Sequence, residues 1–210
     1  MPLVWLSCAV AAVLLSLGVT GTLASWTQAV ITNDTNTVAT AQAVILRESS
    51  GAASCLSSAA ASNSSTCSTI NKYGGTATPL TPGTNQVTTV TFTDIGAAAA
   101  SSFVLIPGAC SQSPAVGSGT PAAPNLCTSG DLTVAISCSP GTTYSSGSAW
   151  TDLAYAAAAP GALPASLTHT GAWAAGGSVT CQFTVALIAG AAVSDQGITL
   201  SQPLTWTLKQ

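Results

Sequence analysis

The residues of this chain with the clearest chemistry are cysteines, of which there are seven. Cys8 belongs to an apolar N-terminal run, and the other six lie in the remainder of the chain. An even number of cysteines in an exported protein indicates a framework of disulfide bonds. Their order and the lengths of the intervening loops predict the pairs Cys55–Cys67, Cys110–Cys127 and Cys138–Cys181. The third pair would join two strands.

A metal site is the alternative use of these cysteines. Zinc sites combine Cys and His ligands at short, regular spacing, but this sequence has no C-x-x-C pair and a single histidine, His169. The acidic residues stand singly, without the clustered oxygen ligands that calcium requires. We therefore expect disulfides, and neither a metal nor another cofactor.

Catalytic residues are the next question. His169 could in principle form a Ser-His-Asp triad with Asp131, Asp152 or Asp195, but the chain has no G-x-S-x-G elbow and no H-E-x-x-H motif. Paired carboxylates for glycoside hydrolysis would have to come from six scattered acids. We expect no enzymatic activity, and we expect His169 to be a surface residue of a strand or loop.

The charge content excludes one class of partner. Three basic and six acidic residues in 210 give a net charge of −3. Nucleic-acid binding needs clustered Lys and Arg, so nucleic acid is not expected as a partner. A surface built from Ser, Thr, Asn, Gln and Gly, with so little repulsion between copies, favours either tolerance of salt and acid or self-association.

An apolar run from Pro2 to Val19 opens the chain. Followed by small residues, it predicts a signal peptide over residues 1–25, cleaved in the region of Ala24, Ser25 and Trp26. The alternative is an uncleaved membrane helix over residues 3–23, which would tether the protein. Neither has a basic flank. Both place the rest of the chain outside the cytoplasm, and we expect a secreted or cell-surface protein.

Alternation with a period of two dominates the remaining sequence, and it predicts strands. The expected strands cover residues 38–46, 86–94, 103–106 with both faces covered, 132–138, 179–187 and 204–208. One short helix is expected over residues 151–159, ended by Pro160. Asp94 is expected to be a turn residue at a strand end, and Trp150, Trp173 and Trp206 to be core or loop anchors. The pattern indicates an all-β antiparallel sandwich that forms one domain over residues 39–210, preceded by the apolar signal helix.

Three parts of the sequence resemble a known family. The segment Thr20–Gln28, with the letters TGTLASWTQ, is similar to the end of the signal peptide in the TasA/camelysin family, although Gln28 stands where an acidic residue is usual. Further on, Val87–Gly96 followed by Phe103–Ile106 resembles that family's strand–N-x-G–strand unit, with Asp94 in place of Asn. The closing segment, residues 195–206, is similar to the last strands of members from high-GC Gram-positive bacteria.

The resemblance implies a jelly-roll sandwich, processing by a dedicated signal peptidase and assembly of copies into extracellular matrix fibres. It also implies that residues 26–38 can leave their own subunit and add a strand to the next one. The apolar anchors of this assembly segment would be Trp26, Val30, Ile31 and Val38. Two alternatives stay open: the segment is a disordered N-terminus, or the protein is a monomeric or membrane-tethered adhesion module.

Overall fold

The computed structural model describes Thr35 and residues 37–210, and residues 42–210 form one compact unit. Residues 37–41 belong to a separate unit; they are exposed and have no regular structure. Within the described residues there are eleven strands: β1 (Leu46–Ser50), β2 (Ala53–Leu56), β3 (Asn85–Asp94), β4 (Ala100–Pro107), β5 (Ser111–Ser113), β6 (Leu132–Pro140), β7 (Tyr155–Ala158), β8 (Leu167–Trp173), β9 (Ser178–Leu187), β10 (Thr199–Ser201) and β11 (Leu204–Lys209). Short 3₁₀ turns connect them: η1 (Ser57–Ala59), η2 (Ser146–Ser148), η3 (Thr151–Leu153), η4 (Pro160–Ala162) and η5 (Val193–Asp195).

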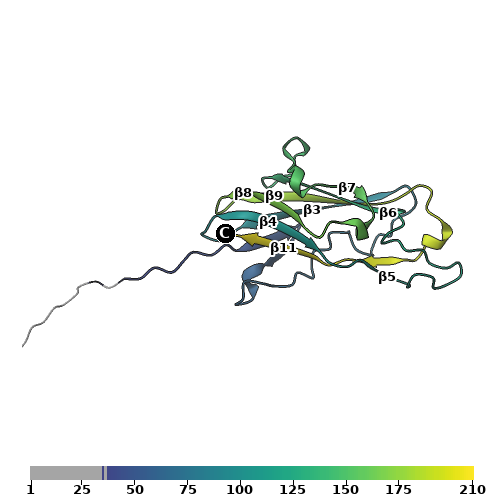
Figure 1. Ribbon diagram of the computed structural model, residues 1–210, viewed down its shortest axis with the longest axis horizontal. Coiled ribbons are helices and arrows are strands. Elements are labelled where there is room, and N and C mark those ends of the chain that lie inside the picture. The colour runs from purple at the N-terminus through teal and green to yellow at the C-terminus, as the bar shows by residue number, and fades with distance from the viewer. Residues whose placement is uncertain (1–34, 36) are drawn as a thin grey trace, which may run out of the picture. The chain divides into compact units, whose positions relative to one another are not determined.

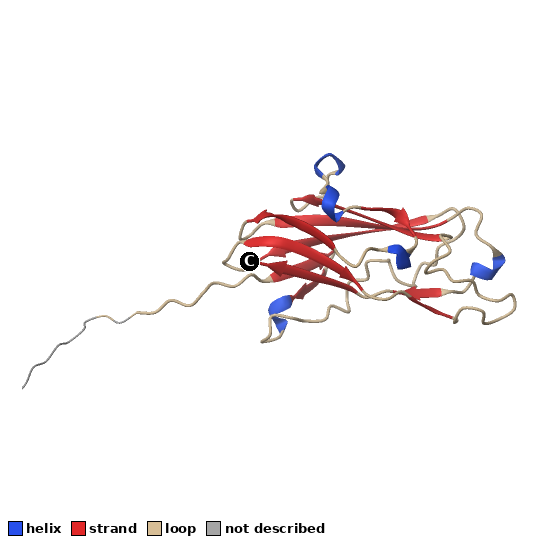
Figure 2. Cartoon of the chain, viewed as in Figure 1, coloured by secondary structure: helices blue, strands red, loops and turns tan. Residues whose placement is uncertain are grey.

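These strands form two layers (Figures 1 and 2). In the described part of the chain, the larger sheet has the order β2-β1-β3-β9-β6-β7 and the smaller one the order β11-β4-β8. Every pair is antiparallel. Of the long strands, β3, β6 and β9 lie in the larger sheet, and β4, β8 and β11 in the smaller one. The chain therefore changes layer between each of these long strands and the next, as in jelly rolls. The expected all-β antiparallel sandwich is confirmed.

The smaller sheet continues into a two-stranded ribbon of β5 and β10. The last β4–β11 pair is Pro107 with Leu204, and the first pair of the ribbon is Ser111 with Ser201. Three residues on one strand face two on the other across this break, which gives the irregular pairing of a bulge. Figure 1 shows β5 beyond the end of β11. The second layer therefore narrows from three strands to two along the length of the sandwich.

Aromatic side chains fill the core where both sheets are complete. Phe92 of the larger sheet meets Phe103 and Trp206 of the smaller one, with ring centroids 5.2 and 4.4 Å apart. Phe92, Phe103 and Phe183 are fully buried. The period of two explains their placement: alternate residues of β3, β6 and β9 point inward, as predicted for these strands. The tryptophan prediction is confirmed for Trp173 and Trp206, which lie in or against this core.

The three predicted disulfides are confirmed. Their S–S distances are 2.02 Å for Cys55–Cys67, 2.04 Å for Cys110–Cys127 and 2.03 Å for Cys138–Cys181. As expected, the third joins two strands: Cys138 of β6 lies directly opposite Cys181 of β9. Both of these cysteines have no exposed surface.

Two sequence-based predictions were wrong. The helix expected over residues 151–159 is instead η3 followed by strand β7, which pairs with β6. The strand expected over residues 38–46 begins only at Leu46. Its partner strand β3 ends at Asp94, which pairs with Leu46, so no residue of β3 remains to pair with residues 38–45. A smaller correction concerns β4: Ile106 is 46% exposed, so its second face is not fully covered. No helix among the described residues is long and apolar enough to cross a membrane.

Candidate functional site

Most of the predicted processing and assembly residues cannot be placed. Ala24, Ser25, Trp26, Val30 and Ile31 lie outside the described residues. Val38, the remaining member of the expected assembly segment, is 93% exposed. An apolar side chain so exposed contributes nothing to the stability of its own subunit, and it is free to contact another surface.

The chain enters the compact unit through residues 42–45, which we call the root. All four of its carbonyl oxygens accept hydrogen bonds, and none of these bonds belongs to a strand ladder. The donors, in order from Gln42 to Ile45, are Gln210 Nε2 at 2.8 Å, the backbone nitrogen of Ala98 at 3.3 Å, Asn63 Nδ2 at 2.8 Å and the backbone nitrogen of Ile95 at 2.8 Å. The root is therefore held by turns and side chains at one end of the sandwich.

Asp94 and Gly96 form the turn that supports the root. The Oδ1 atom of Asp94 accepts bonds from the backbone nitrogens of Gly96 (2.9 Å) and Ile45 (3.2 Å). This confirms Asp94 as a turn residue at the end of β3, with its side chain fully buried. Gly96 is required by close packing, because a Cβ atom there would overlap the carbonyl oxygen of Ala43.

The strand beside the root, β11, has an open edge. It pairs with β4 on one side, and on its other side no strand of the described residues pairs with it. Two other edges are shorter, since β2 and β7 have four residues each, and the edge strand β8 is partly covered by η3. An unpaired row of backbone N–H and C=O groups is a template for an added strand. Gln210 follows β11 directly, so its bond to Gln42 places the start of the root at the C-terminal end of this strand.

The only histidine of the sequence lies in β8, where its side chain is 20% exposed. The prediction of a strand residue is confirmed, but the ring is largely covered. It stacks on Trp150 with centroids 3.6 Å apart, and Nδ1 of His169 lies 3.0 Å from both carboxylate oxygens of Asp152. Within the described residues, no hydroxyl group hydrogen-bonds to this imidazole. The contacts fasten η3 to β8, and they make Trp150 the loop anchor that we expected.

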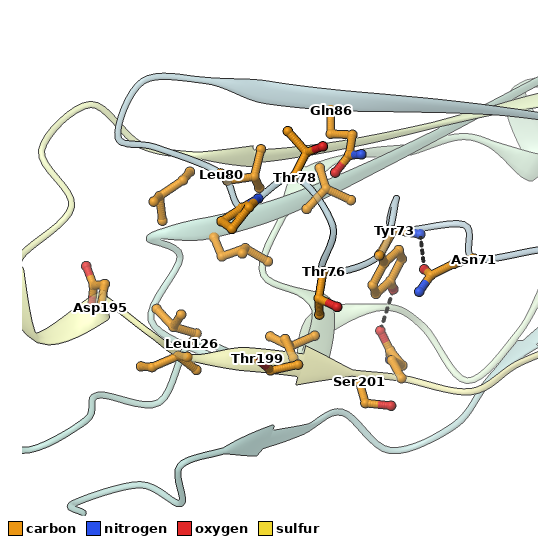
Figure 3. Close-up of a pocket in the computed structure, with 18 of the residues that line it drawn as sticks. Asn71, Tyr73, Thr76, Thr78, Leu80, Gln86, Leu126, Asp195, Thr199 and Ser201 are labelled. Carbon is orange, nitrogen blue, oxygen red and sulfur yellow. Dashed lines mark hydrogen bonds between the residues drawn. The ribbon is translucent and has the colours of Figure 1, made fainter. Parts of the chain in front are cut away.

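A cavity of about 770 Å³ lies where the second layer narrows. One wall is the inward face of the larger sheet, in the part of the sheet that lies past the aromatic core. The other wall comes from residues 67–82 and from β10. Figure 3 shows the lining side chains of this interlayer cavity. Its apolar surface is aliphatic, made by Leu80, Leu126, Leu132, Val185, Leu187 and Leu200.

Polar side chains gather at the two ends of the interlayer cavity. Figure 3 places Asn71 and Tyr73 at one end and Asp195 at the other. Asn71 is exposed, and we call the end that it lines the open end. Asp195 is 7% exposed; its Oδ2 accepts a bond from the backbone nitrogen of Ala192 at 2.7 Å, and its Oδ1 is buried without a partner among the described residues. Lys72 also lines the cavity, where Glu48 neutralises it through an ion pair.

Tyr73 gives this end a neutral donor. Its hydroxyl donates to Oε1 of Gln202 at 2.6 Å. Burial of the side chain, and to a lesser extent the neighbouring Tyr155, raises the pKa of the phenol above its usual value. The phenol therefore stays protonated at any ordinary pH.

Sequence reasoning missed the interlayer cavity, although one signal for it was present. Gln86 is a polar residue at an inward position of β3, in phase with Val90 and Phe92. The chain also makes room for it: Gly74 has a φ of +85°, and a Cβ atom there would overlap the Gln86 amide. A polar residue on an inward face indicates either a hydrogen-bonded core or a cavity.

Comparison with known proteins adds no relative: no protein-family model matches the chain, and no characterised protein has a matching sequence.

Proposed function

We propose that this chain is a non-enzymatic structural protein, exported to the cell surface, whose copies join into an extracellular fibre of the biofilm-matrix type. A signal peptidase would remove residues 1–25. Residues 26–38 of one copy would then add a strand to the open edge of β11 in the next copy. Head-to-tail contacts of this kind do not close into pairs, so they propagate a filament.

One observation carries the proposal: the root lies at the end of β11, a six-residue sheet edge with which no other strand of the described residues pairs on its outer side. The Gln210–Gln42 bond joins the two. An added strand gains main-chain hydrogen bonds along the edge, and the exposed Val38 would contribute an apolar contact. Residues 26–38 carry a single charge, at Asp34, so little opposes docking.

Three disulfides and a surface with few charges also support an extracellular location. Disulfides persist in oxidising compartments, and six cysteines are paired here. The environment of His169 supports a structural role over catalysis, because its hydrogen bonds within the described residues go to Asp152 alone.

Electron microscopy of the exported, processed protein tests the proposal. Deletion of residues 26–36 should leave a folded monomer that forms no filaments. Thr207→Lys on β11 should also block filaments, because a charge on an edge strand opposes strand addition. The matched control is Thr184→Lys on β9, a strand paired on both sides by β3 and β6, which should leave filaments intact.

The opposite results would remove the fibre proposal. Filaments that persist after the deletion rule out the assembly segment as donor. Filaments blocked equally by Thr184→Lys and Thr207→Lys rule out the β11 edge. A monodisperse monomer of the unaltered protein across pH and salt would favour the second function, a monomeric or membrane-tethered adhesion module.

A further inference from the structure

We propose that the interlayer cavity binds an uncharged amphiphile with one aliphatic chain and a hydroxylated head group. This inference does not depend on fibre formation, and either proposal can fail without the other. It rests on the size of the cavity, the separation of its apolar and polar surfaces, and the charges around it.

The volume fits a small molecule. A cavity of about 770 Å³ falls inside the range of roughly 300–1,000 Å³ that small-molecule sites occupy. The cavity arises from the difference between the two layers. The larger sheet extends past the aromatic core, whereas the second layer there is only the β5–β10 ribbon. Among the described residues, Tyr73 at one end is the single aromatic side chain that lines this part of the space between the layers.

The aliphatic wall selects the body of the ligand. Leucine and valine side chains contributed by β6, β9 and β10 face the cavity, together with Leu80 and Leu126. Sugars are bound largely by aromatic faces, and among the described residues that line the cavity Tyr73 is the single aromatic. A flexible alkyl chain matches this surface, since apolar contact is not directional.

The open end selects the head group. In the described part of the chain, the Asn71 amide nitrogen and the Gln86 amide oxygen have no hydrogen-bond partner, while Asn71 Oδ1 accepts from the backbone of Tyr73 at 2.9 Å. One free donor and one free acceptor suit hydroxyl groups, which can both accept and donate. Threonine side chains at positions 76 and 78 add further hydroxyls to the lining between this end and the Asp195 end (Figure 3).

Charge excludes the ionised amphiphiles. Lys72 is already paired with Glu48, so an anionic head would find no free cation, and Asp195 adds a negative group to the lining. A cationic head at the open end would lack a counter-charge as well, because Asp195 lies at the opposite end (Figure 3). A charged head at this end would lose part of its hydration without gaining an ion pair. A neutral head avoids that loss.

Isothermal titration of the full chain with three dodecyl probes, each below its micelle concentration, tests this. The probes are 1-lauroylglycerol, laurate and dodecylammonium. We expect 1-lauroylglycerol to bind with one molecule per chain and at least about tenfold more tightly than either ion. Laurate or dodecylammonium binding as tightly as 1-lauroylglycerol would overturn the proposal, and so would the absence of saturable binding.

Variants locate the binding. Leu200→Trp fills the cavity from β10 and should weaken 1-lauroylglycerol binding at least about tenfold. Val87→Trp places the same side chain on the outward face of β3, where Val87 is 50% exposed, and should change nothing. The apolar residues 2–19 are present in both variants. A difference between the two variants in affinity for 1-lauroylglycerol therefore comes from the cavity. Equal affinities in the two variants would overturn the proposal.

A second variant guards against misfolding of Leu200→Trp. Gln86→Leu keeps the bulk of the side chain and removes the amide, so it should weaken 1-lauroylglycerol binding at least about fivefold. Binding of 1-dodecanol, which has a single hydroxyl, should be much less affected. Circular dichroism confirms the fold of each variant. An equal loss for both probes, or none for 1-lauroylglycerol, would contradict the assignment of Gln86 to the head group.

Discussion

The side-chain nitrogen of Gln210 donates a hydrogen bond to the carbonyl oxygen of Gln42 over 2.8 Å, and so joins the last residue of the chain to the first residue of the compact unit. Gln210 immediately follows the open strand β11, and Gln42 immediately follows the exposed stretch that contains Val38. The bond therefore ties the start of the compact unit to the end of β11, the proposed acceptor strand.

The turn that supports the root should be intolerant of a side chain at Gly96. In Gly96→Ala, the new methyl group meets the backbone of the root, which cannot move as a flexible side chain can. We expect a loss of about 1–3 kcal/mol in the free energy of unfolding, as for other overpacked sites, measured by urea denaturation. Gly147→Ala is the control, since nothing lies within 4 Å of a Cβ atom there. Equal losses in the two variants would contradict the close packing.

Tyr73 should make the fold sensitive to alkali. Its pKa is raised in the folded state by burial, so the stability that its neutral form contributes is complete below the unfolded pKa of about 10 and is lost as the pH rises above that value. The melting temperature should fall more steeply above about pH 10 for the unaltered protein than for Tyr73→Phe. If the melting temperatures of the two proteins fall equally with pH, the phenol of Tyr73 has the same pKa in the folded and the unfolded state.

The disulfides should differ in their resistance to reduction. Cys138 and Cys181 have no exposed surface, whereas Cys55 and Cys67 are partly exposed. A phosphine reductant at a temperature where the fold persists should open Cys55–Cys67 first and leave Cys138–Cys181 closed, as followed by alkylation and mass spectrometry. Simultaneous opening of both bonds would mean that the core is accessible to the reagent without unfolding.

Trp206 should be the most costly side chain to truncate in β11. It contacts Phe92 and Phe103 with ring centroids 4.4 and 5.0 Å away. Trp206→Ala should cost about 3–5 kcal/mol of unfolding free energy. Trp206→Phe should cost clearly less, because it keeps an aromatic ring and removes an indole nitrogen that is buried without a partner among the described residues. Similar costs for both would argue against the aromatic contacts.

The long strands and the disulfides could be predicted because local sequence determines them. In β9, the inward series from Val179 to Val185 is apolar or cysteine, and its buried face follows from the period of two alone. The order of the cysteines was sufficient because each predicted bond joins consecutive cysteines of the described residues.

The missed elements depend on partners far away in the sequence. The alanine-rich stretch after Thr151 is too short to be stable as an isolated helix, and pairing with β6, through Val134–Ala158 and Ile136–Tyr155, makes it the strand β7. For the interlayer cavity, the decisive fact is where the smaller sheet narrows, at the Gly108–Pro203 break. The periodicity of the sequence around Gly108 and around Pro203 does not show that these two segments lie opposite each other.

The bond between Gln210 and Gln42 has a mechanical consequence for a fibre. Tension between neighbouring copies would enter each subunit at residues 42–45 and leave along β11, so the load would pass through the end of the sandwich that holds the aromatic core. The hollow half would carry almost none of this force. It could then bind and release a ligand while the filament is under tension.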